Sequence, residues 1–242
     1  MKIVIITAMP VESKAVMGRA KPRKTSLPGG RKRYCARIGG HDIVLVEAGM
    51  GMFNADWAAT ALTGEAPDLM LSAGFGGAVL DGLVVGDVVL AEQVMRWSDS
   101  GLEEVAVEFH GSRFDTDRPL IRRGVYITCT MVLNKHALSH MLPGNIVNPV
   151  VEMESAAVAR VAATHHIPFL GLRAISDPWD EELAFSVSEF CGDDMRIRPV
   201  KVLTTVLKHP SIIPQLIRLA RNSRIAAASL TLAMERLLHQ LL

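Results

Sequence analysis

The sequence predicts a single α/β domain whose helices cover both faces of a mostly parallel β-sheet. Continuous apolar runs rich in Ile and Val recur along the chain, as in Ile3–Ala8 and Ile167–Ser176, and this pattern is typical of strands buried on both faces. Segments of helical character separate these runs. With 242 residues, 49% apolar and only 5% aromatic, the chain is long enough for one large aliphatic core.

The elements of the first half can be assigned in order. The strand Ile3–Ala8 is followed by Pro10, which suits a helix start, and we expect a short helix over Val11–Arg19. The stretch Lys21–Arg33 is basic and rich in Gly and Pro, which favours a solvated loop. The next elements are a hairpin of Tyr34–Ile38 and Asp42–Glu47, a helix over Asn54–Gly64, a strand over Asp68–Ser72 and a glycine-rich bend at Gly74, Gly76 and Gly77.

The second half alternates in the same way. We expect strands over Val84–Val94 and Gly124–Met131, whereas the polar region Trp97–Arg123 between them fits no regular element. Asn134 is a suitable N-cap for a helix over Lys135–Met141. A small-residue helix over Glu154–His165 and the strand Ile167–Ser176 follow, and helices fill the remainder. No repeat or linker divides the chain, so residues 1–242 are interpreted as one domain.

Charge is balanced overall but unevenly distributed. Lys and Arg total 26 and Asp and Glu 25, so the net charge of +1 argues against a nucleic-acid partner. Residues 199–242 carry a net +5 and residues 1–198 a net −4, which makes the C-terminal segment a basic helical extension. Its apolar stripe consists of Ile212, Ile213, Leu216, Ile217 and Ala220. The stripe fits a terminal helix packed on the sheet, or a peripheral contact with an anionic membrane.

Cysteine content and hydropathy indicate the compartment. Cys35, Cys129 and Cys191 lie far apart, which argues against a disulfide framework, and Cys129 reads as an inert core thiol. The first apolar run is too short for a signal peptide, and no stretch approaches the roughly 20 apolar residues of a membrane span. A cytoplasmic protein is therefore expected.

The predicted sheet also indicates where a ligand would bind. In open α/β sheets, ligands lie beyond the carboxyl ends of the strands. The segments at those ends are 8–12, 48–54, 72–78 and 176–180. Gly49 and Gly51 in the second segment suit close approach to a ligand at a helix N-terminus, or a turn needed for helix–strand packing.

Carboxylates that could take part in binding or catalysis stand at the start of one predicted helix and in the last of these segments. Glu152 and Glu154 either stabilise the dipole of the helix that follows or bind the vicinal hydroxyls of a ribose. Asp177 ends an apolar strand, where desolvation favours its neutral form and general-acid chemistry. The alternative is a simple helix cap, and Ser176 would orient the carboxyl group in either case.

Taken together, these segments resemble the purine and uridine phosphorylase superfamily, and within it the methylthioadenosine/S-adenosylhomocysteine nucleosidases. The matching motifs follow one another in family order over residues 1–180: Ile6–Glu12, Gly49–Ala55, Ala73–Gly77 with Val85–Asp87, Val151–Glu154 and Arg173–Asp177. The resemblance implies a three-layer α/β/α sandwich around a mixed, barrel-like central sheet, with C-terminal helices. It also implies a homodimer and no metal or organic cofactor.

The resemblance further implies roles for individual residues. Asp177, supported by Ser176, would protonate the purine at N7, and Glu12 would activate the attacking water. Glu154 would bind the ribose hydroxyls, and Met153 would pack under the sugar. The other substrate-binding candidates are Ala8, Met9, Gly74, Phe75, Glu152, Val132 and Leu133.

The reaction class is then a choice between hydrolysis and phosphorolysis. Phosphorylases of this superfamily carry an arginine just before the glycine-rich bend, where Leu71–Gly74 has none. Glu12 would also repel phosphate, so we expect a nucleosidase acting on a 5′-substituted purine nucleoside, such as methylthioadenosine or an adenosyl lipid of the hopanoid type. A phosphate-dependent phosphorylase and a non-catalytic nucleoside-binding module remain the alternatives. Phe75 is bulkier than the family's usual residue, which leaves the 5′ group open.

His136 and His140 stand four residues apart on a predicted helix, a spacing that can bind zinc. No third ligand lies nearby in the sequence, and a solvated helix face is the favoured interpretation.

Overall fold

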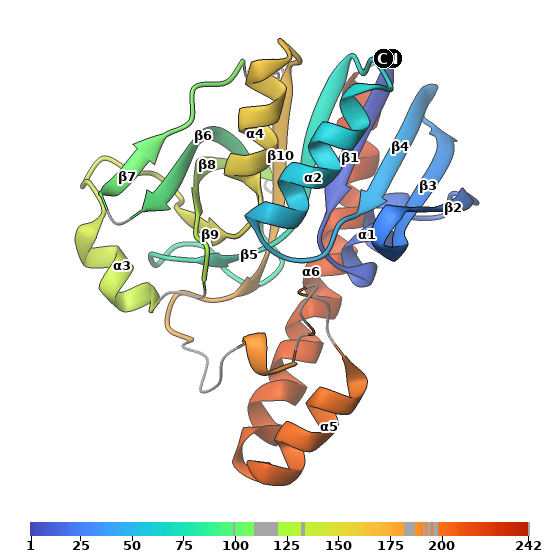
Figure 1. The fold of residues 1–242 in the computed structure, drawn as a ribbon. Helices are drawn as coiled ribbons and strands as arrows, with labels where there is room; N and C mark the ends of the chain where they lie inside the picture. The colour runs from blue at the N-terminus through green and yellow to red at the C-terminus, as the bar shows by residue number, and fades with distance from the viewer. Residues whose placement is uncertain are drawn as a thin grey trace.

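The computed structural model describes residues 1–98, 100–108, 121–131, 134–181, 187–190, 192, 195 and 198–241. A mixed β-sheet lies at the centre, with helices on both sides (Figure 1). The strands are β1 (Lys2–Thr7), β2 (Arg23–Leu27), β3 (Arg31–Ile38), β4 (His41–Glu47), β5 (Leu69–Ala78), β6 (Val88–Ser98), β7 (Gly101–Glu104), β8 (Ile121–Thr128), β9 (Val150–Glu152) and β10 (Phe169–Asp177). The helices are α1 (Pro10–Met17), α2 (Met52–Thr63), α3 (Lys135–Met141), α4 (Ser155–Thr164), α5 (Pro199–Lys208) and α6 (Ile213–Gln240), with short 3₁₀ turns at Pro28–Gly30, Val187–Phe190 and Pro210–Ile212.

The sheet closes on itself over part of its length. Strands β10, β6, β8, β9 and β5 follow one another as neighbours, and β10 also pairs with β5, which completes a barrel-like ring. From β5 the sheet continues through β1, β4, β3 and β2. Of the ten strand pairings, five are parallel and five antiparallel. The mixed, barrel-like sheet is confirmed, whereas a mostly parallel sheet is wrong because β3, β6 and β9 run against a neighbour.

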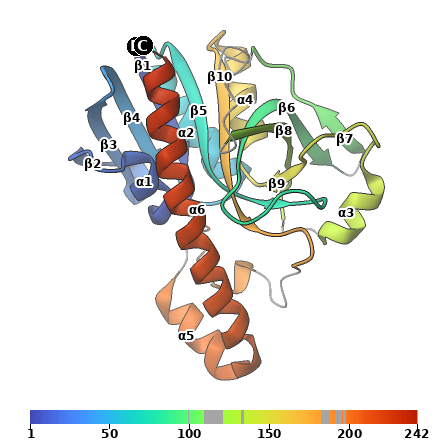
Figure 2. The same ribbon diagram turned by 180° about the vertical axis from the view of Figure 1, so that it is seen from behind.

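Helices cover the sheet in two layers. Helices α2 and α4 lie together on the face seen in Figure 1, and α1 and α6 cover the opposite face, seen in Figure 2. The second half of α6 belongs to the core, because it buries Ala226, Leu230, Ala233, Met234, Leu237 and Leu238. A terminal helix therefore packs on the sheet, but not through the stripe predicted for it. Ile213, Ile217 and Ala220 of that stripe stand in the first half of α6 and are exposed, so the expectation is wrong for those residues. The first half of α6 and all of α5 extend beyond the sheet as a helical hairpin (Figure 1).

Local sequence explains most of these elements. Residues Ile3–Ile6 of β1 are at most 1% exposed, as expected for a strand covered on both faces. Helix α1 starts at Pro10. Proline has no backbone N–H, and at the first position of a helix this N–H would have no acceptor within the helix. The side chain of Asn134 accepts from the N–H of Ala137 at 2.7 Å, so the predicted cap of α3 is confirmed.

One local prediction is wrong, and another is made more specific by the structure. Within the stretch predicted as a loop, Arg23–Leu27 forms the edge strand β2, paired antiparallel with β3. An edge strand with both faces near solvent has no apolar periodicity to reveal it. The glycines after Ser72 lie inside β5, which continues through them to Ala78 and curves as it enters the barrel (Figure 2). Their small size lets β9 approach, since a Cβ on Gly76 would lie 2.4 Å from Cγ1 of Val150.

The unassigned region after β6 contains regular structure. Strand β6 extends to Ser98 and pairs with the short β7, and β8 begins at Ile121. Residues 109–120 lie outside the described part of the chain. None of the described helices combines the length and apolar character needed to cross a bilayer.

Candidate active site

A cavity with about 900 Å³ of empty space, part of it open to solvent, lies at the carboxyl ends of β1, β4 and β10. All four predicted strand-end segments contribute to it, which confirms that they meet. Nine of the residues proposed from the sequence line this cavity: Ala8, Met9, Glu12, Phe75, Glu152, Met153, Glu154, Ser176 and Asp177. The rest of the lining was not proposed as site residues from the sequence: Met50, Gly76, Gly77, Met131, Lys135, Val151 and Glu181.

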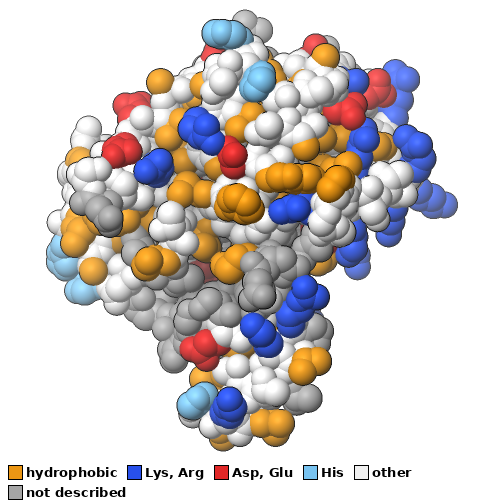
Figure 3. All heavy atoms as spheres, viewed as in Figure 1, with side chains coloured by type: hydrophobic (Ala, Val, Ile, Leu, Met, Phe, Trp, Pro, Cys, Tyr) orange, Lys and Arg blue, Asp and Glu red, His pale blue; other side chains and the backbone are white. Residues whose placement is uncertain are grey.

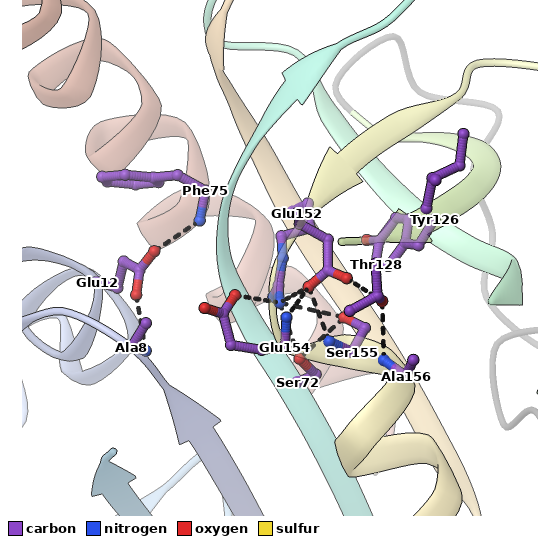
Figure 4. Close-up of polar contacts among 12 residues, drawn as sticks. Ala8, Glu12, Ser72, Phe75, Tyr126, Thr128, Glu152, Glu154, Ser155 and Ala156 are labelled. Carbon is purple, nitrogen blue, oxygen red and sulfur yellow. Dashed lines mark hydrogen bonds and ion pairs between the residues drawn. The ribbon is translucent and has the colours of Figure 1, made fainter. Parts of the chain in front are cut away.

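The carboxylate of Glu12 is fixed in one orientation. One oxygen accepts from the N–H groups of Ala8 at 2.9 Å and Met9 at 2.8 Å, and the other accepts from Phe75 N–H at 2.9 Å (Figure 4). Burial raises the pKa of Glu12, against the charge of Arg173 and the three backbone donors. A fixed, desolvated carboxylate of this kind can orient a water molecule and accept its proton.

Gly74 lies beside Glu12 and is not among the residues that line the cavity. A Cβ at this position would lie 2.6 Å from Oε1 of Glu12. Gly74 therefore leaves room for the carboxylate, and any effect of this residue on substrate passes through Glu12.

Asp177 ends β10 at the cavity wall, with Ser176 as a hydrogen-bond donor to its carboxylate. Burial raises the pKa of Asp177, and the ammonium group of Lys135 opposes this shift. Lys135 is only 6% exposed, and its Nζ donates to the carbonyl oxygen of Pro178 at 2.5 Å. A carboxyl group with a raised pKa at a cavity wall can act as a general acid near neutral pH.

Glu152 is held inside the wall by internal donors. Its carboxylate accepts from the backbone N–H groups of Glu154 at 3.0 Å and Ser155 at 2.8 Å, and from the hydroxyl of Thr128 (Figure 4). Arg173 Nη2 lies 2.6 Å from its Oε2. Burial alone would raise the pKa of Glu152, but Arg173 and the other donors outweigh burial and lower it. These partners occupy the carboxylate, so Glu152 supports the wall of the cavity.

Glu154 has fewer partners and faces the cavity. It accepts from Gly51 N–H at 2.9 Å, and Arg173 Nη2 lies 3.5 Å from its other oxygen. Burial and the neighbouring charge of Glu152 raise the pKa of Glu154 to about 7, although Arg173 acts in the opposite direction. A carboxylate with free lone pairs in a cavity suits the paired hydroxyls of a sugar.

Apolar side chains supply the rest of the lining. Ala8 and Met50 form a small buried cluster, against which Met9 and Met195 pack. Met153, Phe75 and Met131 add further apolar surface to the cavity. Val132 and Leu133, the other predicted apolar walls, lie outside the described residues.

Sequence reasoning missed the roles of Arg173 and Lys135. Arg173 is 1% exposed in a strand that is otherwise almost entirely apolar, and a charge in such a run is the signal that could have revealed it. Lys135 follows a polar N-cap at the start of a helix, where lysine is ordinarily solvated, and no sequence signal marks it.

The histidines of α3 are the candidate metal ligands among the described residues. The described part of the chain contains no group of three or more His, Cys, Asp or Glu side chains placed to hold a metal ion. His136 and His140 contact each other on the exposed face of α3, with their Nε2 atoms 3.3 Å apart. The solvated helix face predicted for this pair is confirmed.

Comparison with known proteins agrees with this geometry. A family model described as Phosphorylase superfamily matches residues 2–119 and 98–208. A 5′-methylthioadenosine/S-adenosylhomocysteine nucleosidase from Haemophilus influenzae (strain PittEE) is 29% identical over 211 residues, covering 78% of this chain and 92% of that protein.

Solved structures share the fold. The Campylobacter jejuni 5′-methylthioadenosine/S-adenosyl homocysteine nucleosidase has a TM-score of 0.70 at 17% identity and covers all of this chain and 98% of its own. The futalosine hydrolase of Helicobacter pylori has a TM-score of 0.63 at 18% identity, over 73% of this chain and 84% of its own. The resemblance seen in the motifs is confirmed, and the chain belongs to the phosphorylase superfamily.

Proposed function

We propose that the protein is a nucleosidase that hydrolyses the N-glycosidic bond of a 5′-substituted purine nucleoside. The observation that carries this proposal is one cavity lined by both Glu12, fixed by three N–H donors, and Asp177, whose pKa is raised. The named relatives are N-ribosyl hydrolases, which supports the same enzyme class.

The residues divide the reaction between them. Asp177 donates a proton to N7 of the purine while the C1′–N9 bond breaks, and the bonding electron pair leaves with the base. Water forms the new bond to C1′ and loses its proton to Glu12, so one proton is given and one is taken in each turnover. Glu154 binds the ribose hydroxyls, Met153 packs against the sugar, and Ser176 orients Asp177.

The charge of the lining favours water over phosphate as the nucleophile. Among the described lining residues, five are carboxylic acids: Glu12, Glu152, Glu154, Asp177 and Glu181. Lys135 is the one Lys or Arg of this lining. Arg173 and Arg218 lie outside the lining, where they pair with Glu152 and Glu181. Lys135 is thus the one cation of the described lining that could receive a phosphate dianion, and the fixed carboxylate of Glu12 would repel it.

Methylthioadenosine, S-adenosylhomocysteine, inosine and futalosine, each with and without phosphate, form the test panel. We expect base release that is independent of phosphate and yields the free sugar, with any 5′ substituent still attached. Formation of a ribose 1-phosphate would replace the proposal with a phosphorylase, and binding without turnover of any of the four would replace it with a nucleoside-binding module.

The apolar side of the cavity bears on the 5′ group. Met9, Met50 and Phe75 suit a thioalkyl substituent, and an adenosyl lipid such as adenosylhopane is the larger candidate. The protein would be cytoplasmic, and the hairpin of α5 and α6 would bind it to the surface of an anionic membrane. The hairpin exposes Val200, Leu207, Ile213 and Ile217 together with Lys201, Lys208, Arg218, Arg221 and Arg224 (Figure 3).

Membrane contact is tested by co-sedimentation with phosphatidylserine vesicles. Truncation is unsuitable because the second half of α6 is part of the core. We expect the double variant Leu207→Glu/Ile217→Glu to pellet several-fold less than the wild type. A Met141→Glu control, which alters an exposed apolar residue at the end of α3, should pellet like the wild type. Equal pelleting of all three would exclude this surface.

A homodimer is the proposed assembly, through the exposed surface of α2 and α4. Phe53 on α2 is 83% exposed and lines a shallow hollow with Met52, Ala156 and Ala157. Light scattering after size exclusion should give twice the chain mass for the wild type and a monomer for Phe53→Glu. A monomeric wild type would reject the dimer.

A further inference from the structure

The turn that follows Asp177 is attached to two elements outside the barrel. The carbonyl oxygen of Pro178 accepts from Lys135 Nζ at 2.5 Å and from Glu181 N–H at 3.2 Å. Glu181 closes the turn and lines the same cavity as Asp177. The turn thus carries two acidic side chains into the cavity, only four residues apart.

Arg218 of α6 forms an ion pair with Glu181, the second of the two acidic residues on this turn. Its Nε lies 2.7 Å from Oε1 of Glu181, whose side chain is 6% exposed. The side chain of Arg218 is 57% exposed, so a cation at the surface pairs with a carboxylate inside the protein. It belongs to the hairpin half of α6 that extends beyond the sheet (Figure 2).

The pairing has a consequence for Asp177. A buried carboxylate that loses its cation must take up a proton or turn toward water, and either change moves the chain around it. Glu181 is close enough for its charge to raise the pKa of Asp177, and Lys135 lowers it from the other side. The position of Glu181 therefore contributes to the electrostatic surroundings of Asp177, and the short turn between the two residues links their positions.

We propose that Arg218 is a positioning residue for the general acid, and that it acts by anchoring Glu181 and thereby the turn from Asp177 to Glu181. This inference rests on the proposed role of Asp177. Through Arg218, the hairpin of α5 and α6 would support the geometry of the active site, whatever else its outer surface contacts.

The first test needs no catalytic activity. Hydrogen exchange of the full-length protein is followed in peptides that cover residues 176–181, for the wild type, Arg218→Met, Arg218→Lys and Arg221→Met. Arg221 is exposed on the same helix and is the matched control. We expect exchange at least tenfold faster in Arg218→Met, near-wild-type exchange in Arg218→Lys, and no change in Arg221→Met. Equal exchange in Arg218→Met and Arg221→Met would overturn the proposal.

The second test uses the reaction. Arg218→Met should lower kcat by about 10- to 100-fold with a smaller change in KM, because a displacement of about 1 Å can cost on the order of 100-fold. If Glu181 takes up a proton or turns away, its charge no longer raises the pKa of Asp177, and the alkaline limb of the pH profile should move to lower pH. The double variant Glu181→Gln/Arg218→Met lacks the same ion pair, so it should lose about as much kcat as Arg218→Met and no more, because both residues act through one contact. A kcat equal to that of Arg221→Met overturns the proposal, and a wild type without activity refutes the nucleosidase while hydrogen exchange still decides the role of Arg218.

Discussion

Arg173 Nη2 lies 2.6 Å from Oε2 of Glu152, and both side chains are almost completely buried. The same Nη2 atom donates to the hydroxyls of Ser72 at 3.0 Å and Ser155 at 3.1 Å. Arg173 therefore joins β10, β5 and the start of α4 behind the cavity. Because Glu154 follows Glu152 by two residues, this network also fixes the carboxylate proposed to bind the sugar.

Replacing Arg173 should destabilise the whole protein. Arg173→Met leaves the carboxylate of Glu152 buried without its cation, and such a loss costs about 3–5 kcal/mol of unfolding free energy. Urea unfolding followed by circular dichroism measures this cost. Arg122→Met is the control, because its side chain is 46% exposed and its ion pair with Asp87 should contribute no more than about 1 kcal/mol. Equal losses of unfolding free energy in the two variants would show that the buried ion pair contributes no more to stability than the surface ion pair.

Asp177→Asn should remove turnover and leave the fold intact. The amide keeps the shape of the carboxyl group but has no acidic proton to give to the base, so we expect kcat to fall by about 10²- to 10⁴-fold. The unfolding midpoint should change little. Asp180→Asn, exposed on the same turn, is the matched control and should retain full activity. Substantial activity in Asp177→Asn would assign the proton donor to another group.

Lys135 should set the upper end of the pH range. It lowers the pKa of Asp177 against the larger effect of burial, so Lys135→Met should raise this pKa further. A general acid works only while it holds its proton, and the alkaline limb of kcat/KM should therefore move to higher pH. His140→Ala, on the exposed face of the same helix, serves as the control. An unmoved limb would mean that Asp177 does not govern it.

Gly74→Ala tests whether the fixed orientation of Glu12 matters. The new Cβ would lie 2.6 Å from Oε1 and 2.9 Å from Cδ of Glu12, so the carboxylate must give up at least one of its backbone donors. We expect kcat to fall by about 10- to 100-fold, with a smaller change in KM. Gly64→Ala has open space around its Cβ and should behave as wild type. Wild-type kcat in Gly74→Ala would argue against a precisely placed base.

How much of this site the sequence could predict depends on how local each signal is. Glu12 and Asp177 stand beside predicted strand ends, and the geometry of α/β sheets brings strand ends together, so their meeting in one cavity was predictable. Glu154 follows no predicted strand, and only the family resemblance placed it in the same site. The ring closed by β10 and β5 was predictable only from family resemblance, because strand pairing between distant segments leaves no periodic mark in either one.

The missed features arise from tertiary contacts. The glycines at 74, 76 and 77 predict a bend, but nothing in the sequence shows that Glu12 lies against Gly74 and Val150 against Gly76. Lys135 becomes a cavity residue because Pro178, 43 positions away in sequence, supplies its acceptor. Similarly, Arg218 appears in the sequence as one of several basic residues on a helix, and its pairing with Glu181 depends on where α6 passes the cavity.

Glu154 should make stability depend on pH in a defined window. Its pKa is about 7 in the folded protein, raised by burial and by Glu152 from the ordinary 4.5. Between these values the folded protein keeps a proton that the unfolded chain releases, so the wild type loses stability as pH rises from about 4.5 to about 7 and no further above that. Glu154→Gln has no such proton, and its stability relative to the wild type should increase across this window by up to about 3 kcal/mol. Urea unfolding at a series of pH values measures the difference, with the exposed Glu104→Gln as the control. Curves for Glu154→Gln and wild type that stay parallel from pH 4 to 8 would show that Glu154 is already ionised, with Arg173 outweighing its burial.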